Sequence, residues 1–197
     1  GTKLRTLLAV LALHVGRVVP AEQLVDVLWG EDPPAGVRNS LQGLVSKLRR
    51  SLGATDLVAM RGSGYALELP PDAVDVHRFE QLVTDGQRAA VSGDLSTAVS
   101  LLTEATSLWR GDALADFAYE DFAAPVATRL SELRLAAVEE RIELELQLGR
   151  HAAVVVELEA LVAEQPLRER LRALLMLALY RSGRQADALR VFQDGRQ

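Results

Sequence analysis

The chain has 197 residues, of which 49% are hydrophobic, 25% are charged and none is cysteine. This composition is typical of a globular protein with a substantial core. The lack of cysteine excludes a disulfide framework, a thiolate nucleophile and a Cys-ligated zinc site, and with only three histidines we expect no metal site. No apolar run approaches the roughly 20 residues that cross a bilayer, and no signal peptide is visible, so no membrane partner is expected.

Charge divides the chain into two parts at Leu69-Pro70-Pro71-Asp72. Residues 1–70 carry 8 basic and 6 acidic side chains, whereas the remaining 127 residues carry 14 basic and 21 acidic ones. Two adjacent prolines interrupt regular structure and stiffen a connection. The sequence therefore predicts two domains, residues 1–70 and 71–197, with different functions.

The first domain is predicted to contain three helices and a hairpin. Apolar periodicity places the helices at residues 4–15, 20–29 and 37–52, with a Pro-rich loop at 30–36. Two β-prone runs, 57–60 and 65–69, flank the Gly-rich turn 61–64. This order predicts a winged helix-turn-helix whose wing is a β-hairpin, within a mainly α protein.

The third helix carries the strongest functional signal in the sequence. At about 100° per residue its apolar side chains share one face, and no acidic residue occurs between Val37 and Leu52. The opposite face carries Asn39, Gln42, Gly43, Ser46 and Arg50, with Lys47 and Arg49 on its flanks. Amides and hydroxyls can read base edges, and Lys and Arg bind phosphates and guanine, so this face predicts DNA binding. The alternative interpretation is an ordinary solvated helix face. We also expect Arg61, in the turn of the hairpin, to reach DNA from the wing. The alternative for Arg61 is an ordinary exposed turn residue.

The second domain is predicted to be helical, with helices at 77–92, 95–110, 122–148, 152–164, 168–182 and 185–193. Gly93, Gly149 and Gly183 each precede a small or apolar residue at +5, and the last two are 34 residues apart. This is the tetratricopeptide period, so a tetratricopeptide-like domain is expected. Aromatic residues around 111–121 are interpreted as a packing plug, and the acids at 139–145 as a solvated face. No catalytic motif is present, so we expect neither an enzyme nor a cofactor.

Several stretches resemble known bacterial regulators. Residues 17–30, 44–53 and 61–67 resemble the OmpR/PhoB-type winged-helix DNA-binding domain, and residues 74–80, 108–111 and 148–151 resemble the bacterial transcriptional activator domain. Together they are similar to the SARP-type regulators, the AfsR/DnrI group of secondary-metabolite activators. The resemblance implies binding to direct repeats in double-stranded DNA as a side-by-side homodimer, recruitment of RNA polymerase, and a cytoplasmic location.

The resemblance also assigns roles to residues. Lys47 matches a base-contacting position, Trp29 a contact to the DNA backbone and Arg61 a contact from the wing. Positions that face a groove or phosphate match Asn39, Ser40, Gly43, Ser46 and Arg49. Leu44 also matches, but its periodicity turns it inward and we exclude it. Glu31 and Asp32, in the loop 30–36, match the segment that meets polymerase.

Winged-helix domains of this type begin with a small sheet, whereas this chain starts almost at the first helix. We therefore expect the sheet to be missing. Without it, we expect the hairpin to have an unpaired edge. Larger relatives continue into an ATPase domain. Two alternatives to a DNA-binding activator therefore stay open, a tetratricopeptide-type protein–protein adaptor and the regulatory fragment of a larger ATPase regulator.

Overall fold

The computed structural model describes residues 1–195, except for the side chain of Thr55. The chain forms two compact units. The first contains Gly1–Gln81 and Gly111–Arg129, and the second contains Leu82–Arg110 and the chain from Leu130 onward. No helix in the described part of the chain is both long and apolar enough to span a membrane.

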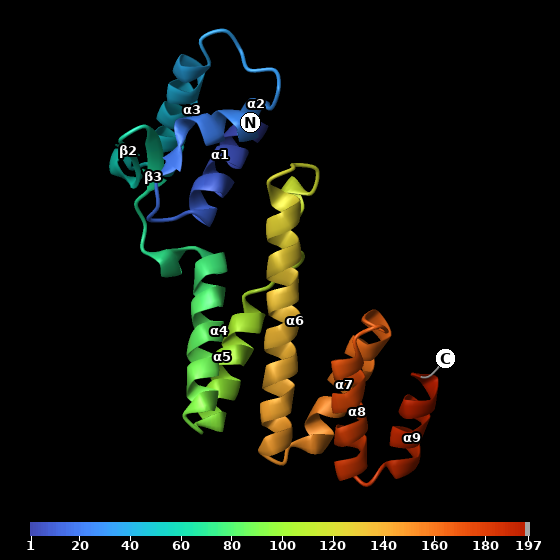
Figure 1. Cartoon of the computed structure of the whole chain (residues 1–197). Coiled ribbons are helices and arrows are strands. Elements are labelled where there is room, and N and C mark those ends of the chain that lie inside the picture. The colour runs from blue at the N-terminus through green and yellow to red at the C-terminus, as the bar shows by residue number, and fades with distance from the viewer. Residues whose placement is uncertain (196–197) are drawn as a thin grey trace. The chain divides into compact units, whose positions relative to one another are not determined.

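The first unit has the predicted winged-helix order of three helices followed by a hairpin (Figure 1). Its elements are α1 (Thr2–Leu13), β1 (Val19–Pro20), α2 (Ala21–Trp29), α3 (Val37–Leu52), β2 (Val58–Arg61) and β3 (Gly64–Leu67). Gly53 ends α3 with a φ of 70°, the left-handed conformation that glycine adopts readily. The hairpin turns on two residues with a positive φ at Gly62 only, as in a type II′ turn.

Among the described residues, the hairpin has the expected unpaired edge at β2 but not at β3. The sheet has the order β1-β3-β2, so the short strand β1 covers β3 from the other side. No pattern in the sequence predicts β1, because two residues carry no periodicity. Gly64 permits the close approach, since a Cβ at this position would lie 2.2 Å from the Val19 carbonyl oxygen.

The core of this unit confirms the predicted inward face of α3. Leu41, Val45 and Leu48 are buried together with side chains of α1, α2 and the hairpin, and Leu44 is half-buried against the same cluster. Burial of apolar surface at about 25 cal/mol per Å² makes this cluster the main stabilising contribution of the unit. The packing fixes which face of α3 is left exposed.

A segment distant in sequence completes the same unit. Phe122 packs against the winged-helix core and lies 5.7 Å from the ring of Phe117, and Asp116 pairs with Arg5 of α1 at 3.5 Å. The predicted aromatic plug is therefore only partly right. Tyr119 is fully exposed, and Trp109 belongs to the other unit, where Arg134 lies over its ring.

The second unit is built from helices joined by tight turns. They are α5 (Leu95–Ser107), α7 (Val155–Glu164), α8 (Glu169–Arg181) and α9 (Gln185–Asp194), with most of α4 (Asp75–Val91) and α6 (Ala123–Gln147). Gly93, Gly149 and Gly183 have φ values of 84°, 80° and 80°, which confirms their predicted role in the turns. The residues at +5, Ala98, Val154 and Ala188, are all buried, as expected for close contacts between helices.

The acids at 139–145 depart from the predicted solvated face. Glu139 is only 2% exposed, and its carboxylate is paired with Arg168 at the start of α8. Glu143 pairs with Arg170 and Glu145 with Arg150. Glu139 and Glu143 therefore connect α6 to the start of α8, which the sequence pattern of α6 alone did not show.

Candidate nucleic-acid interface

The outward face of α3 presents two parallel rows of side chains. One row contains Gln42, Ser46 and Arg50, and the other contains Asn39, Gly43 and Lys47, and all six residues are exposed. Residues four apart lie above one another on a helix, so the six form one continuous surface. The hydroxyl of Ser46 donates to the carbonyl of Gln42 at 2.9 Å, and Nε of Arg50 approaches the carbonyl of Ser46 at 3.4 Å.

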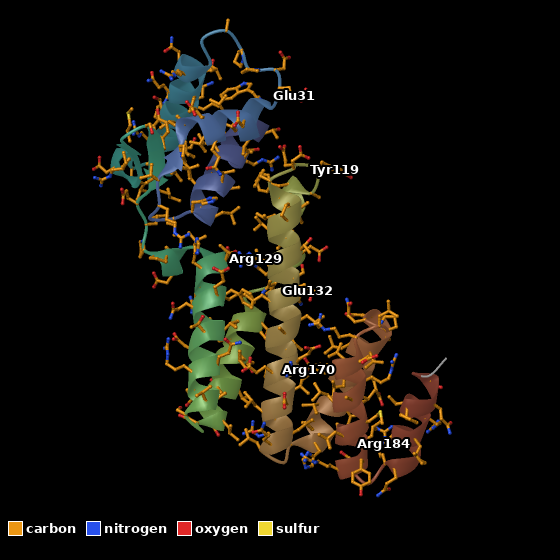
Figure 2. All side chains as sticks on the ribbon, in the orientation of Figure 1. Glu31, Tyr119, Arg129, Glu132, Arg170 and Arg184 are labelled. Carbon is orange, nitrogen blue, oxygen red and sulfur yellow. The ribbon has the colours of Figure 1, made fainter. Side chains whose placement is uncertain are left out.

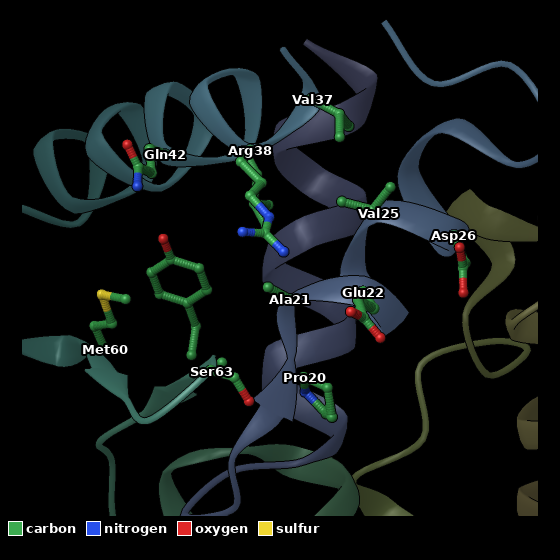
Figure 3. A pocket seen from close by; sticks show the side chains of 13 residues that line it. Pro20, Ala21, Glu22, Val25, Asp26, Val37, Arg38, Gln42, Met60 and Ser63 are labelled. Atoms are coloured by element: carbon green, nitrogen blue, oxygen red, sulfur yellow. The ribbon is translucent and has the colours of Figure 1, made fainter. Parts of the chain in front are cut away.

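Arg38 extends this surface and was missed by the sequence analysis. It is exposed and stands four residues before Gln42, at the head of the same row. Figure 3 shows Arg38 and Gln42 reaching from α3 over a groove between α2, α3 and the hairpin. The four-residue spacing to Gln42 was the signal that would have identified Arg38 in the sequence.

The groove has a volume of about 440 Å³ and is lined by both apolar and charged side chains (Figure 3). Tyr65 and Met60 contribute from the hairpin, and Glu22 and Asp26 contribute from α2. Acidic side chains repel phosphate, so contacts to a DNA backbone are expected from the α3 and hairpin sides of the groove.

Gly43 has no packing role in the folded chain. A Cβ built at this position would meet no atom within 4 Å. Glycine inside a helix costs about 1 kcal/mol relative to alanine, and the fold gives nothing in return here. The missing side chain leaves the backbone of α3 open at the middle of the exposed surface.

Arg49 is not part of this surface in the structure. It is half-buried, and its Nε and Nη2 donate to the carbonyl oxygen of Val58 at 2.9 and 2.6 Å. Ser40 is also half-buried. The structure therefore sets apart two of the predicted contact residues from the exposed rows.

Trp29 lies at the end of α2 and packs partly against the core. The ammonium group of Lys3 sits 5.0 Å from the centre of its ring and donates to the carbonyl of Leu28. This cation–π contact joins α1 to α2. The structure does not bring Trp29 into the two rows of α3.

Arg61 ends β2 beside the turn of the hairpin. Its side chain is 62% exposed and its Nη2 lies 3.2 Å from Oε1 of Glu68. An exposed ion pair of this kind contributes little stability, so the guanidinium can exchange Glu68 for a phosphate at small cost.

Glu31 and Asp32 lie in the loop between α2 and α3, and both are exposed. Figure 2 shows Glu31 on this loop, clear of the β2–β3 hairpin. Two carboxylates at this place are available to a protein partner but are unsuited to DNA phosphates.

Comparisons with known proteins agree with this architecture. Residues 1–67 match the family described as "Transcriptional regulatory protein, C terminal", and residues 74–197 match the "Bacterial transcriptional activator domain". The chain is 41% identical to the regulatory protein DnrI of Streptomyces peucetius, covering 96% of this chain and 74% of DnrI. The chain belongs to the SARP-type family of transcriptional activators.

Other SARP relatives are longer than this chain. The regulatory protein AfsR of Streptomyces coelicolor is 45% identical over 98% of the chain, which spans only 19% of AfsR. The solved structure of Mycobacterium tuberculosis EmbR in complex with a low affinity phosphopeptide matches with a TM-score of 0.91 and 38% identity, over 98% of this chain and 52% of that one. DNA binding and activation of transcription are thus properties of the SARP family, built on a winged helix followed by a helical activator domain.

Proposed function

We propose that the chain reads a specific DNA sequence and activates transcription of secondary-metabolite genes by recruiting RNA polymerase. The observation that carries the proposal is the acid-free helix α3, whose whole outward face is exposed and lined by amide, hydroxyl and basic groups. No catalytic or cofactor chemistry is part of this activity.

The two rows of α3 divide the contacts in the major groove. Lys47 and the amides of Asn39 and Gln42 suit base edges, because they offer directed donors and acceptors at the middle of the surface. Arg38 and Arg50, at the two ends of one row, suit phosphates. Arg61 of the wing suits the adjacent minor groove. The open backbone at Gly43 allows α3 to approach the bases closely.

The helical domain serves to orient the DNA reader and to pair two copies on direct repeats. Its sequence, residues 71–197, has 21 acidic and 14 basic side chains, which disfavours contact with phosphates. Such an activator works in the cytoplasm, where its DNA is. The proposal keeps residues 1–70 as the part that contacts DNA, and the segment 111–129 packs with that part in the same compact unit.

Lys47→Ala should weaken binding to the specific site by roughly tenfold or more, because a lost base contact costs about 1–3 kcal/mol. Binding to unrelated DNA should fall much less. The measurement is titration of a duplex selected from a random pool by the wild-type chain, at several salt concentrations. Arg110→Ala, an exposed basic residue outside α3, is the matched control and should leave both affinities near wild type. If Lys47→Ala binds its site as the wild type does, the reading face lies elsewhere and the adaptor function gains support.

Recruitment of polymerase can be separated from DNA binding at the loop 30–36. Glu31→Lys combined with Asp32→Lys should leave DNA affinity intact or slightly raised, because the change adds positive charge, while transcription from purified components falls severalfold. The control reverses two exposed acids of the helical domain, Glu164 and Asp194, and should keep full transcription. Full transcription by the loop variant would move the polymerase contact to another surface.

A further inference from the structure

The carbonyl of Val58 lies on the open edge of the sheet. Leu57 accepts a hydrogen bond from the backbone N–H of Glu68 at 2.7 Å, and Val58 pairs in register with Leu67. In an antiparallel ladder, hydrogen-bonded and non-hydrogen-bonded pairs alternate. The polar backbone groups of Val58 therefore point away from β3. Val58 is fully buried, and a buried carbonyl without a donor would be costly.

Arg49 supplies the donors that this carbonyl needs. It stands in the last turn of α3, and both Nε and Nη2 reach the same oxygen, at 2.9 and 2.6 Å. The planar guanidinium holds its donors in a fixed fork, so two bonds to one atom define a direction as well as a distance. The contact joins the recognition helix directly to the first strand of the wing.

We propose that Arg49 is a positioning residue that holds the wing at a fixed angle to α3, and that it does not bind phosphate itself. The inference rests on the proposed DNA binding. Val58 begins β2 and Arg61 ends it, so an anchor at Val58 sets where the guanidinium of Arg61 meets DNA while α3 occupies the groove. Arg50, the next residue, is exposed, and its Nε approaches the carbonyl of Ser46 within α3, so it is a matched control.

A double-mutant cycle on the 197-residue chain tests this role. Affinities for the selected duplex are compared for wild type, Arg49→Ala, Arg61→Ala and the double variant. If Arg49 acts through the wing, Arg49→Ala should weaken binding roughly tenfold in the wild type but less than about twofold when Arg61 is already absent. The proposal would be overturned if Arg49→Ala lost the same affinity in both backgrounds. A direct phosphate contact would also lower the slope of log affinity against log salt concentration by a further unit or so in the double variant.

Arg49→Lys gives a second and independent answer. Lysine keeps the charge but lacks the fork, so a positioning role predicts nearly the full loss of affinity, whereas a phosphate contact predicts that most of it is retained. Arg50→Ala should lose affinity to the same extent whether or not Arg61 is present.

A measurement without DNA separates this inference from the proposed function. Amide hydrogen exchange at Ala59 and Arg61, whose pairs with Ala66 and Gly64 are the hydrogen-bonded ones, should become at least about tenfold faster in Arg49→Ala and stay unchanged in Arg50→Ala, because only the former loses the anchor of β2. Unchanged exchange in Arg49→Ala would overturn the anchor even if the chain binds DNA. Faster exchange in a chain that selects no DNA would keep the anchor and refute DNA binding.

Discussion

Replacing Arg168 with alanine should lower the free energy of unfolding of the helical unit by about 3 kcal/mol, because it leaves a buried carboxylate without its main partner. Glu139 on α6 is 2% exposed. Arg168 donates to its two oxygens at 2.8 and 3.4 Å and also bonds Glu132 at 2.7 Å. After the substitution the nearest remaining cation is Arg170, at 3.9 Å from Glu139.

Arg170→Ala is the matched control for this prediction. Arg170 bonds Glu143 at 2.7 Å, but both side chains are about half exposed, so the loss should stay below about 1 kcal/mol. Figure 2 shows Arg170 at the start of α8 and Glu132 on α6. A loss for Arg168→Ala as small as that for Arg170→Ala would mean that Glu139 finds water or another donor.

Unfolding of the helical unit can be followed separately. The chain has two tryptophans, Trp29 in the first unit and Trp109 in the second, so urea unfolding of a Trp29→Phe background reports the helical unit. Replacing both partners, Arg168→Met with Glu139→Leu, should restore most of the lost stability, since apolar residues of similar size can substitute for a buried ion pair.

The ion pair of Arg168 should not be lost through titration of Arg168 near neutrality. Hydrogen bonds from Arg168 to Glu139, and then to Glu132, raise the pKa of Arg168 above its ordinary value. A raised pKa stabilises the fold at every pH below the unfolded pKa, which for a guanidinium is above about 12. The charge of Arg168 is therefore fully present between about pH 6 and 9, so its titration adds no pH dependence to the stability of the wild-type helical unit over that range, which urea unfolding at several pH values measures.

Local patterns in the sequence predicted the helices and the exposed face of α3 well. The bounds of α3 agree with the prediction, because a long apolar period and a terminal glycine are signals within one helix. The turns at Gly93, Gly149 and Gly183 agree for the same reason, since a positive φ and a small residue at +5 are local requirements. The fold class and the exposed rows of α3 follow from such signals.

Contacts between distant residues were not predictable in this way. Glu139 looks like any solvated acid in its own helix, and its burial depends on Arg168, 29 residues away. Nothing in the sequence around Arg49 indicates that its guanidinium bonds the carbonyl of Val58, nine residues away. Strand β1 exists because β3 offers it a partner, and its two residues have no signal of their own.

The segment 111–129 is the largest such case, because it lies in the predicted helical domain but packs with the winged helix. Phe122 contacts the winged-helix core, and Arg129 bonds Glu80 at 2.6 Å within the same unit. The core that positions α3 therefore includes side chains from beyond residue 70. The stability of the DNA reader is expected to depend on them.

Phe122→Ala should accordingly lower the free energy of unfolding of the winged-helix unit by about 2–3 kcal/mol, slightly less than for a fully buried phenylalanine because Phe122 is half-buried. The loss combines apolar surface returned to water with the contact to Phe117. Urea unfolding in a Trp109→Phe background, which leaves Trp29 as the reporter in this core, measures it. Tyr119→Ala, three residues away and fully exposed, is the control and should change stability by less than about 0.5 kcal/mol. Equal stability of the two variants would show that the winged helix is complete without the segment 111–129, and would place the boundary of the DNA reader at residue 70.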